Sequence, residues 1–311
     1  MNNQLLPDDL KVFTTVARCS SFSAAATELG VSPAYVTKRV RLLESQLEVR
    51  LFHRSTRRVV VSEDGERVYE WARKILDNID SLYDEVAKSR ETPRGRLRIC
   101  SSFGFGRNLV APAIAGLVNR YPEIEVRFEV FDHLIDIASE GFDIDIRVGD
   151  EIAGDMVARR LASNYRVLCA APDYLARHGH PRSVADLAGH HCLVIKERDM
   201  QFGVWTVSNG RQQETVKVTG PLSSNNGEIV LRWAVEGRGI ALRSIWDARP
   251  HIERGELVQL LPAWRQEANV WAVYPMRLTG SAKVRVCVEY FEEYFRNRAV
   301  DESANATRKN L

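Results

Sequence analysis

Closely spaced helix start and stop signals in residues 8–47 constrain the fold of this chain more than any other feature. Apolar residues recur at helical spacing over residues 8–19, which predicts a first amphipathic helix. Ser21 or Ser23 then provides an N-cap for a second, alanine-rich helix that runs to residue 29. Gly30 ends this helix, because glycine tolerates the left-handed conformation at a helix C-terminus.

The third helix has the strongest start signal of the region. Ser32 followed by Pro33 combines an N-cap with proline at the first helical position, and the helix is expected to run to about Leu47. Its predicted buried stripe consists of Val36, Val40, Leu43 and Leu47. Its other face is polar and basic and carries Tyr35, Thr37, Lys38, Arg39 and Arg41.

Two helices joined by a short glycine-containing turn, the second with polar and basic residues near its start, form a helix-turn-helix. We expect the third helix to enter the major groove of double-stranded DNA, where Tyr35, Thr37 and Lys38 reach base edges. Arg41 and the cap of the preceding helix would hold phosphates. The alternative is a generic helical hairpin with a charged surface. The predicted DNA-binding residues of this region are Ser23, Ser32, Pro33, Tyr35, Thr37, Lys38 and Arg41.

A short β-hairpin with a basic tip is predicted after the third helix. Its strands are expected in residues 51–54 and 57–61. A wing of this kind lies against the DNA backbone or the minor groove. Arg54, Arg57 and Arg58 are therefore added to the predicted DNA-binding residues.

The charge of the chain is unevenly distributed. The formal net charge is only +2 over 311 residues, yet residues 1–60 hold nine basic and five acidic side chains. Residues 121–155 are acidic instead. A small basic domain joined to a neutral or acidic one is typical of a nucleic-acid reader attached to another module, although a solvated charged face is the alternative.

A long helix is predicted to follow the hairpin. Ser62 can cap it, and apolar residues then follow a heptad pattern to about Ser89, which corresponds to a helix of roughly 40 Å at ~1.5 Å per residue. A narrow apolar stripe on so long a helix favours pairing with a second copy of the chain, and packing into the chain's own core is the alternative. The stripe consists of Val68, Ala72, Ile75, Ile79, Leu82 and Val86.

Strand and helix signals alternate from Gly95 onward. This alternation predicts a mostly parallel sheet with crossover helices. The expected strands are 97–100, 126–131, 144–148, 166–170, 192–195, 216–218 and 270–273. The expected helices are 109–121, 134–140, 184–188, 228–236 and 281–295.

The N-terminal region resembles the winged helix-turn-helix of LysR-type transcriptional regulators. The similarity is carried in order by segments 22–26, 29–32, 36–38, 43–44, 47, 50–54 and 61–65. Three positions depart from the family pattern. Glu48 stands where a glycine usually follows the third helix, so this turn can be shaped differently. Pro33 and Tyr35 stand where a polar and a small residue are commoner, which affects the bases that are read.

The C-terminal part is similar to the effector domain of the same family, through segments 95–99, 121–122, 142–147 and 234–242. The resemblance implies an α/β fold with an N-terminal winged helix-turn-helix, a long linker helix and a C-terminal effector domain of two lobes, similar to periplasmic binding proteins. The expected parts are 1–62 for the DNA-binding domain, 63–94 for the dimerising helix and hinge, 95–298 for the effector domain and 299–311 for a flexible tail. Lobe 1 is expected at about 95–162 and 269–298, and lobe 2 at about 163–268.

In such a fold a small ligand sits between the lobes, at strand ends and helix starts. Backbone N–H groups and serine hydroxyls suit a carboxylate, Arg147 adds a bidentate clamp, and Arg243 is a second cation. For each basic residue the alternative is a salt bridge within the chain, to partners such as Asp132 or Asp145. The predicted effector-binding residues are Ser101, Ser102, Phe103, Asp132, Arg147, Lys196, Ser224, Asn225, Asn226 and Arg243.

Segments 102–107, 195–200 and 223–231 look like those of regulators of bacterial tartrate and D-malate utilisation. The two cations and two helix starts fit a dicarboxylate, and the resemblance implies D-malate or tartrate as its identity. The expected regulator is an activator that forms dimers or tetramers and contacts RNA polymerase. No other cofactor or metal is expected, because His178, His180, His190 and His191 lack a set of ligands at metal-binding spacing. The competing hypothesis is an enzyme or solute-binding module whose N-terminal helices only mediate assembly, but no nucleophile or phosphate-binding motif supports it.

The composition indicates a reduced, cytoplasmic protein. The chain has five cysteines and no CxxC pair, so the thiols are expected to be free. No apolar stretch approaches the roughly 18 residues of a membrane span, and the polar first ten residues do not resemble a secretory signal.

Overall fold

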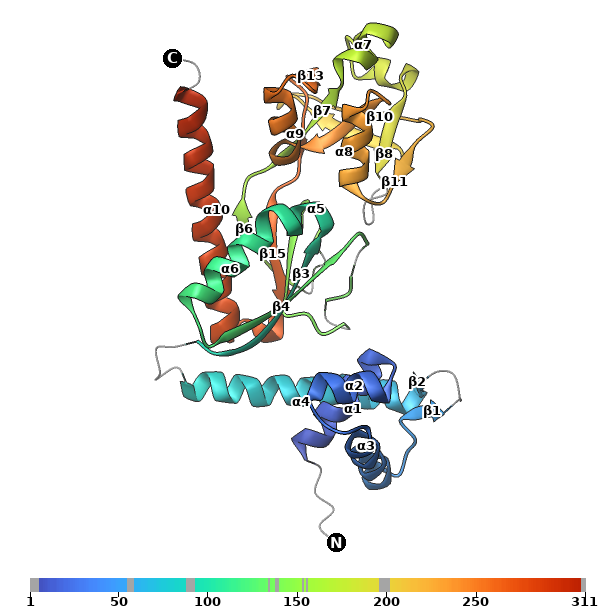
Figure 1. Ribbon diagram of the computed structural model, residues 1–311, viewed down its shortest axis with the longest axis vertical. Coiled ribbons are helices and arrows are strands. Elements are labelled where there is room, and N and C mark those ends of the chain that lie inside the picture. The colour runs from blue at the N-terminus through green and yellow to red at the C-terminus, as the bar shows by residue number, and fades with distance from the viewer. Residues whose placement is uncertain are drawn as a thin grey trace. The chain divides into compact units, whose positions relative to one another are not determined.

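The computed structural model describes residues 6–54, 59–87, 93–133, 135–137, 140–152, 154, 156–195 and 202–308. The chain forms two compact units, Met1–Glu91 and Thr92–Leu311. Figure 1 shows their elements along the chain. Among the described residues, no helix combines the length and the apolar character that a membrane span requires.

Three helices form most of the first unit, and their boundaries follow the predicted signals. They are α1 (Pro7–Cys19), α2 (Phe22–Leu29) and α3 (Pro33–Leu47). The Ser21 side chain caps α2 by accepting a hydrogen bond from the Ala24 amide. Gly30 ends α2 with φ +67°, as predicted. The shared core consists of Leu10, Val12, Phe13, Val16, Ala25, Ala26, Val36, Val40, Leu43, Leu51, Phe52 and Ala72.

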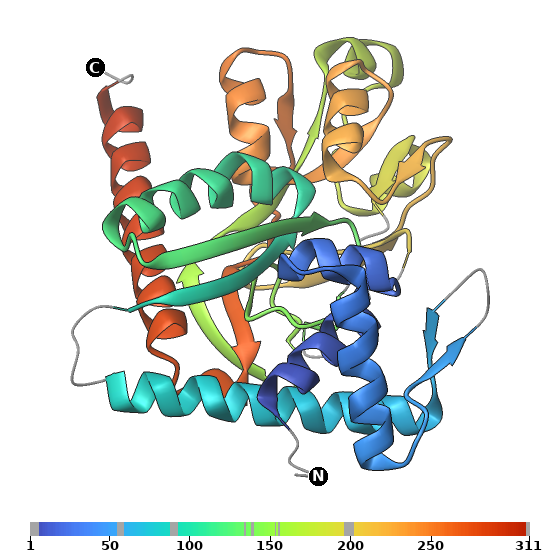
Figure 2. The same ribbon diagram turned by 60° about the horizontal axis from the view of Figure 1, so that its bottom comes forward.

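The predicted wing is an antiparallel hairpin of β1 (Phe52–Arg54) and β2 (Val59–Val61), near the N-terminal end of α4 (Glu63–Ala87) in Figure 2. Ser62 caps α4, because its Oγ accepts a hydrogen bond from the Gly65 amide at 2.9 Å. A Cβ atom at Gly65 would lie 2.2 Å from the Leu51 carbonyl oxygen, so only glycine permits this approach of helix and hairpin.

Helix α4 divides the predicted heptad stripe between two environments. Ala72 is buried in the core of the first unit, and Val68 packs against that core. This part of the stripe therefore packs within the chain, which was the alternative to a dimer seam. Farther along, Ile75 is 37% exposed and Leu82 is 60% exposed. The side chain of Val86 lies outside the described residues.

The second unit begins with a lobe built on a five-stranded sheet in the order β4-β3-β5-β15-β6, which we call lobe 1. Its strands are β3 (Gly95–Ser102), β4 (Ile124–Phe131), β5 (Ile144–Val148), β6 (Met156–Ala162) and β15 (Val270–Pro275). The chain from α5 (Phe103–Phe105) through η1 (Gly106–Val110) and α6 (Ala111–Arg120) packs with α10 (Ala282–Arg308) in one hydrophobic core with this sheet.

Lobe 2 comprises the elements from β7 to β14. Its sheet has the order β11-β8-β12-β7-β13, with β14 also paired to β7. Alternate residues of β7 point to opposite faces, so Leu168 joins the core with α7 while Val167 joins the core with α8 and α9. The strands are β7 (Tyr165–Ala170), β8 (Cys192–Ile195), β9 (Val204–Ser208), β10 (Gln213–Lys217), β11 (Ser223–Ser224), β12 (Ile240–Ser244), β13 (Val258–Leu260) and β14 (Gln266–Glu267). The helices are α7 (Pro172–His178), η2 (Ala185–Gly189), α8 (Gly227–Val235) and α9 (Ile245–Glu253).

Both sheets are mixed, which corrects the prediction of a mostly parallel sheet. In lobe 1, β3 pairs in parallel with β4 and β5, whereas β15 pairs antiparallel with β5 and β6. In lobe 2, β7 pairs antiparallel with β12, β13 and β14. The antiparallel pairs include β6, β7 and β15, the strands through which the chain passes between the lobes, and crossover helices do not set their direction.

Two further predictions differ from the structure. The described residues of 134–140 are not helical, and Ile135 and Ile137 are instead buried in a small core with Phe142. Helix α10 continues to Arg308, where a flexible tail was expected from residue 299. No glycine or proline interrupts 299–308, and its alanines favour a helix, so polarity alone was a poor stop signal.

Candidate functional site

The first candidate surface is the exposed face of α3. The Ser32 Oγ caps the helix by accepting a hydrogen bond from the Tyr35 amide at 3.2 Å. Side chains on the face away from the core are exposed, including Tyr35, Lys38 and Arg41. Thr37 is half-buried, and its hydroxyl donates to the Pro33 carbonyl at 3.0 Å. The start of α3 thus presents an aromatic ring and two cations to solvent.

Arg39 differs from the other cations of α3 because its guanidinium pairs with a buried carboxylate. Its Nε lies 2.6 Å from Oδ1 of Asp9, whose side chain is fully buried. Burial raises the pKa of Asp9, and the Arg39 charge opposes this shift. Arg39 also lies over the Tyr35 ring, at 5.9 Å from its centroid, and so steadies this exposed aromatic side chain.

The remaining predicted DNA-binding residues lie on α2 and the wing. Ser23 is exposed on the first turn of α2. The backbone of Arg54 ends β1, and its side chain lies outside the described residues, as do Arg57 and Arg58. The register of the described hairpin residues places His53 opposite Val60.

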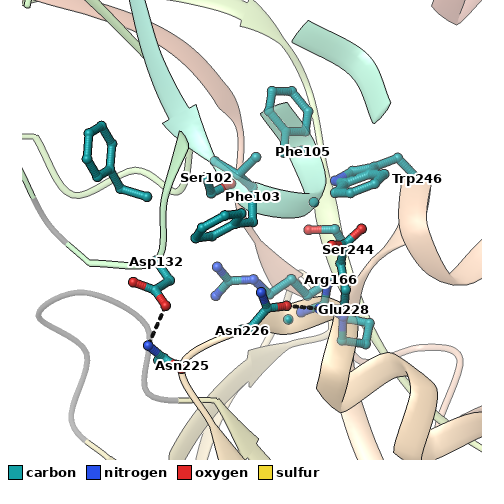
Figure 3. A pocket seen from close by; sticks show the side chains of 15 residues that line it. Ser102, Phe103, Phe105, Asp132, Arg166, Asn225, Asn226, Glu228, Ser244 and Trp246 are labelled. Carbon is teal, nitrogen blue, oxygen red and sulfur yellow. Dashed lines mark hydrogen bonds between the residues drawn. The ribbon is translucent and has the colours of Figure 1, made fainter. Parts of the chain in front are cut away.

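The second candidate site is a cavity of about 80 Å³ between lobes 1 and 2 (Figure 3). One water occupies ~10–15 Å³ on this kind of measure, so the cavity matches a small organic acid rather than a nucleotide. It is lined by the ends of β3 and β4, the start of α8 and the junction of β12 with α9. The lining residues are Ser102, Phe103, Gly104, Phe105, Phe131, Asp132, Val148, Arg166, Asn225, Asn226, Gly227, Glu228, Arg243, Ser244 and Trp246.

Two arginines from neighbouring strands supply the cations of this lining. Arg243 is buried, and its Nε donates to Asp247 at 3.0 Å. Arg166 donates from its Nη1 to Gln266 at 2.7 Å. A Cβ atom at Gly227 would lie 2.3 Å from Nη1 of Arg243, so the guanidinium packs directly on the first residue of α8. Asp247 holds Arg243 in place, and the other edge of the Arg243 guanidinium faces α8.

Polar contacts join the lobes around the cavity. Asn225 donates to Asp132 at 2.5 Å, and Figure 3 shows this bond crossing from one lobe to the other. Glu228 forms an ion pair with Arg107. Asn226 caps α8 by accepting from the amides of Glu228 and Ile229. These contacts connect the start of α8 in lobe 2 with β4 and η1 in lobe 1.

An aromatic contact closes another side of the cavity. Trp246 of α9 meets Phe105 of lobe 1 edge to face, with ring centroids 5.5 Å apart, and Figure 3 shows the two rings next to each other. Phe105 in turn stacks on Phe295 of α10 at 5.9 Å. Within the described part of the chain, the buried Trp246 Nε1 has no hydrogen-bond acceptor. A chain of three rings therefore runs from the cavity into the core of lobe 1.

The structure brings together six of the ten predicted effector residues. The six in the lining are Ser102, Phe103, Asp132, Asn225, Asn226 and Arg243. Ser101 is instead buried and donates to the Ile146 carbonyl at 2.6 Å. Ser224 lies beside the lining, and its hydroxyl accepts from the Asn226 amide at 3.1 Å. Lys196 lies outside the described residues.

Arg147 is not in the lining, although it was predicted as the carboxylate clamp. Its Nη2 lies 2.6 Å from Asp145, and both side chains are buried. Residues two apart on a strand share a face, so the sequence Asp-Ile-Arg in β5 favours this pair, which was the alternative interpretation.

Sequence reasoning missed Arg166, Ser244 and Trp246. Arg166 immediately precedes the apolar run of a predicted strand, so it was taken as part of a core element. Ser244 and Trp246 lie at the start of α9, a helix that the sequence analysis did not predict. The signal was available, because Ser244 precedes a helix with Asp247 in its first turn, a usual N-cap arrangement.

Three histidines of lobe 2, His178, His190 and His191, form an aromatic cluster with Tyr174. Tyr174 stacks on His178 at 4.6 Å, and its hydroxyl accepts from the His191 amide and lies 3.2 Å from Nδ1 of His190. Burial lowers the pKa of His190, and the neighbouring His178 adds to this effect. No group of three or more potential metal ligands is found in the described ranges.

A winged helix-turn-helix followed by a two-lobed α/β domain with a central cavity defines a DNA-binding regulator with a sensor domain. Two family models match the chain: the bacterial regulatory helix-turn-helix protein of the lysR family over residues 7–66, and the LysR substrate binding domain over residues 90–296. The chain belongs to the LysR family of transcriptional regulators.

Known relatives extend over nearly the whole chain. The HTH-type transcriptional regulator DmlR of Escherichia coli strain K12 is 56% identical over 295 residues, which cover 95% of this chain and 96% of that protein. The HTH-type transcriptional activator TtdR of the same strain is 49% identical over 298 residues, with 96% of each chain covered. The structure is similar to that of CrgA, a LysR-type transcriptional regulator from Neisseria meningitidis, at a TM-score of 0.58 and 29% identity, covering 94% of this chain and 99% of that one. These proteins are transcriptional regulators and not enzymes.

Proposed function

We propose that this regulator activates transcription in response to a small dicarboxylate, with D-malate and tartrate as the first candidates. The observation that carries this proposal is the cavity between the lobes, whose lining combines two arginines with side-chain hydroxyls and amides. Guanidinium groups bind carboxylates through charge-assisted hydrogen bonds. The small volume of the cavity favours an acid of about four carbons.

Arg166 and Arg243 are proposed to hold the effector's carboxylates. Ser102, Asn225 and Asn226 supply additional polar contacts, and Phe103 covers the ligand from lobe 1. Arg147 has no part in this proposal, because Asp145 already binds its guanidinium.

The DNA-reading surface is proposed to be the exposed face of α3 together with the wing. Tyr35, Thr37 and Lys38 contact base edges, and Arg41 contacts phosphate. Ser23, Ser32 and Pro33 flank this surface, while Arg54, Arg57 and Arg58 of the wing approach the DNA backbone.

The chain is proposed to act as a dimer or tetramer held by the exposed part of α4 that includes Ile75 and Leu82. A two-fold dimer presents two α3 helices to two half-sites. The activator role is supported by the name of TtdR, the transcriptional activator of Escherichia coli that covers the same length. Contact with RNA polymerase follows from that role.

Footprinting of the full chain on the DNA that flanks its own gene tests this function. We expect a protected region that D-malate or tartrate lengthens or shifts, and an effector-dependent rise in transcript in a purified transcription assay. An unchanged footprint with both acids, and with succinate as the unhydroxylated comparison, would refute the effector while leaving the DNA-binding activity in place.

Binding to the cavity is tested by calorimetry with the same acids. Replacement of Arg166 or Arg243 by alanine should weaken binding at least tenfold, whereas Arg232→Ala should leave it unchanged. Arg232 is a matched control, because it lies on α8 outside the lining and its side chain is 78% exposed. Equal loss in all three variants would contradict the proposed carboxylate seat.

A further inference from the structure

The chain passes between the two lobes at two short connectors. Residues 163–164 join β6 of lobe 1 to β7 of lobe 2, and residues 268–269 join β14 to β15 on the return path. Figure 1 shows both passages, in light green and in orange. Any change in the angle between the lobes must be absorbed at or near these connectors.

Asn164 binds the two connectors to each other. Its side chain is buried, and its Nδ2 donates to the Ala268 carbonyl at 2.7 Å. Its own carbonyl accepts from the Ala268 amide at 2.9 Å. Its amide donates to Oδ1 of Asn269 at 3.4 Å. One residue of the first connector thus makes three hydrogen bonds to the second.

The second connector is in turn fixed to lobe 1. Nδ2 of Asn269 donates to Asp150 at 3.0 Å, and its carbonyl accepts from the Gly149 amide at 2.9 Å. Asp150 also accepts from the indole N–H of Trp271 at 2.7 Å. A displacement at Asn164 is therefore transmitted to the end of β5 and to β15.

Asn164 also reaches the wall of the cavity. Its Nδ2 lies 3.3 Å from Oγ of Ser244, which lines the cavity beside Arg243. Ser244 precedes α9, but its side chain makes no capping hydrogen bond. A serine hydroxyl that accepts one hydrogen bond keeps its own proton free to donate. The Ser244 hydroxyl can therefore donate to an oxygen of a bound effector while it accepts from Asn164.

We propose that Asn164 is the positioning residue that couples the effector in the cavity to the angle between the lobes. A carboxylate or hydroxyl oxygen of the effector accepts a hydrogen bond from the Ser244 hydroxyl. The Ser244 oxygen in turn accepts from the Asn164 amide, which also donates to the Ala268 carbonyl. Because the Asn164 amide donates both to Ser244 and to Ala268, an effector that fixes the Ser244 hydroxyl also fixes the side chain that joins the two connectors. This inference rests on the proposed effector function of the cavity.

The test separates effector binding from effector response in the full chain. Calorimetry with D-malate and tartrate gives the dissociation constant, and footprinting gives the effector-induced change in DNA binding. Asn164→Ala should keep the dissociation constant within threefold of the wild type, because Asn164 is outside the lining. The change in DNA affinity caused by the effector should fall at least tenfold. A residue that only supports the fold would lower both quantities together.

Two further variants test the same relay, and the first of them leaves Asn164 in place. Ser244→Ala removes a single hydroxyl and should weaken both binding and response. The double variant should show no additional loss of response beyond that of Asn164→Ala, because both changes break the same relay. Asn119→Ala, on the exposed end of α6, is the matched control and should respond like the wild type.

The possible failures are distinct. If the wild type binds none of the acids, the effector proposal fails and this inference fails with it. If the wild type binds and responds, and Asn164→Ala responds equally, only the role of Asn164 is overturned. Additive losses in the double variant would also overturn it.

Discussion

At the scale of single residues, Gly227 decides whether Arg243 can reach the cavity. The guanidinium occupies the space that a side chain at this position would take, since an added Cβ would lie 2.3 Å from Nη1 and 2.8 Å from Cζ. A charged group cannot retreat easily here, because Asp247 holds it from the other side and both side chains are buried. The smallest possible substitution at this position is therefore expected to act on the proposed binding site.

Gly227→Ala is expected to weaken effector binding about tenfold, or ~1.4 kcal/mol, because it displaces the guanidinium from the carboxylate. Calorimetry with D-malate and tartrate measures this effect. Gly189→Ala is the control, since nothing lies within 4 Å of an added Cβ there. Full binding by Gly227→Ala would mean that Arg243 does not contact the effector.

Glu48 adopts a left-handed backbone conformation that favours glycine. It ends α3 with φ +55°, so the turn keeps the left-handed geometry although glycine is absent. This conformation costs a residue with a Cβ atom ~1–2 kcal/mol relative to glycine. Replacement by glycine regains less than this amount, because glycine also raises the conformational entropy of the unfolded chain.

Glu48→Gly should therefore raise the free energy of unfolding of the DNA-binding domain by about 0.5–1 kcal/mol. Hydrogen exchange of the α3 core amides in the full chain measures it. Gly30→Ala, at the corresponding position after α2, should have the opposite sign, since its φ is +67°. A destabilised Glu48→Gly variant would show that the glutamate side chain contributes more than the backbone strain removes.

At the scale of elements, strand parity explains which site residues were predictable. The helix-turn-helix follows from local signals, because caps, turn and apolar stripe lie within a few residues of each other. Arg147 and Arg166 both lie on strands of the second unit, yet Arg147 shares a face with Asp145 whereas Arg166 lines the cavity. A sequence that predicts a strand does not say which of its faces meets the other lobe, so Arg147 was predicted in the cavity and Arg166 was not, whereas the predicted Arg243 does line it.

Helix α4 is expected to hold the dimer through the large apolar side chains on its exposed face. Trp71, Ile75 and Leu82 present large apolar surfaces there, and Trp71 alone is 65% exposed. Ile75→Glu combined with Leu82→Glu should raise the dimer dissociation constant at least a hundredfold, about 2.8 kcal/mol, since each buried side chain contributes ~1.5–3 kcal/mol. Sedimentation equilibrium measures it. Glu70→Lys, an exposed change on α4 outside this set of apolar side chains, should leave the dimer intact.

The lowered pKa of His190 predicts that the stability of lobe 2 depends on pH. Burial holds the pKa of His190 below its ordinary value of 6.5 in the folded chain, so the unfolded chain binds this proton more readily. The contribution is complete above pH 6.5 and is lost as pH falls toward the folded pKa. His190→Gln keeps an acceptor for Tyr174 but cannot titrate.

The fall in Tm between pH 7.5 and pH 5 should therefore be smaller in His190→Gln than in the wild type. Differential scanning calorimetry at the two pH values provides the comparison, and His180→Gln is a control on the exposed side of the lobe. An identical pH dependence in both chains would exclude His190 as the group responsible.

At the scale of the whole molecule, the cavity could not be derived from the sequence in the way the helix-turn-helix and its proposed DNA-reading surface could. Its lining comes from segments as distant as Ser102 and Trp246, which meet only because two lobes close on each other. Family resemblance gave the place of the cavity and six of its lining residues, but Ser244 and Trp246 depend on α9, a helix that was not predicted. The small net charge of +2 is similarly uninformative, because it averages parts with different partners.

The salt dependence of DNA binding tests this division of charge in the intact chain. Arg41→Ala removes a proposed phosphate contact, so it should weaken binding to all sequences alike and reduce the slope of log K against log salt by about one per protomer. Lys38→Ala removes a proposed base contact, so it should lose about 1–3 kcal/mol on the preferred sequence and relax specificity at one position. Fluorescence anisotropy with specific and random duplexes, at salt concentrations from about 50 to about 300 mM, separates the two effects.

Arg67→Ala on α4 is the control, because its side chain is exposed and paired with Asp64 rather than placed on α3. A salt slope near zero, or equal behaviour of all three variants, would show that α3 does not carry the DNA contact.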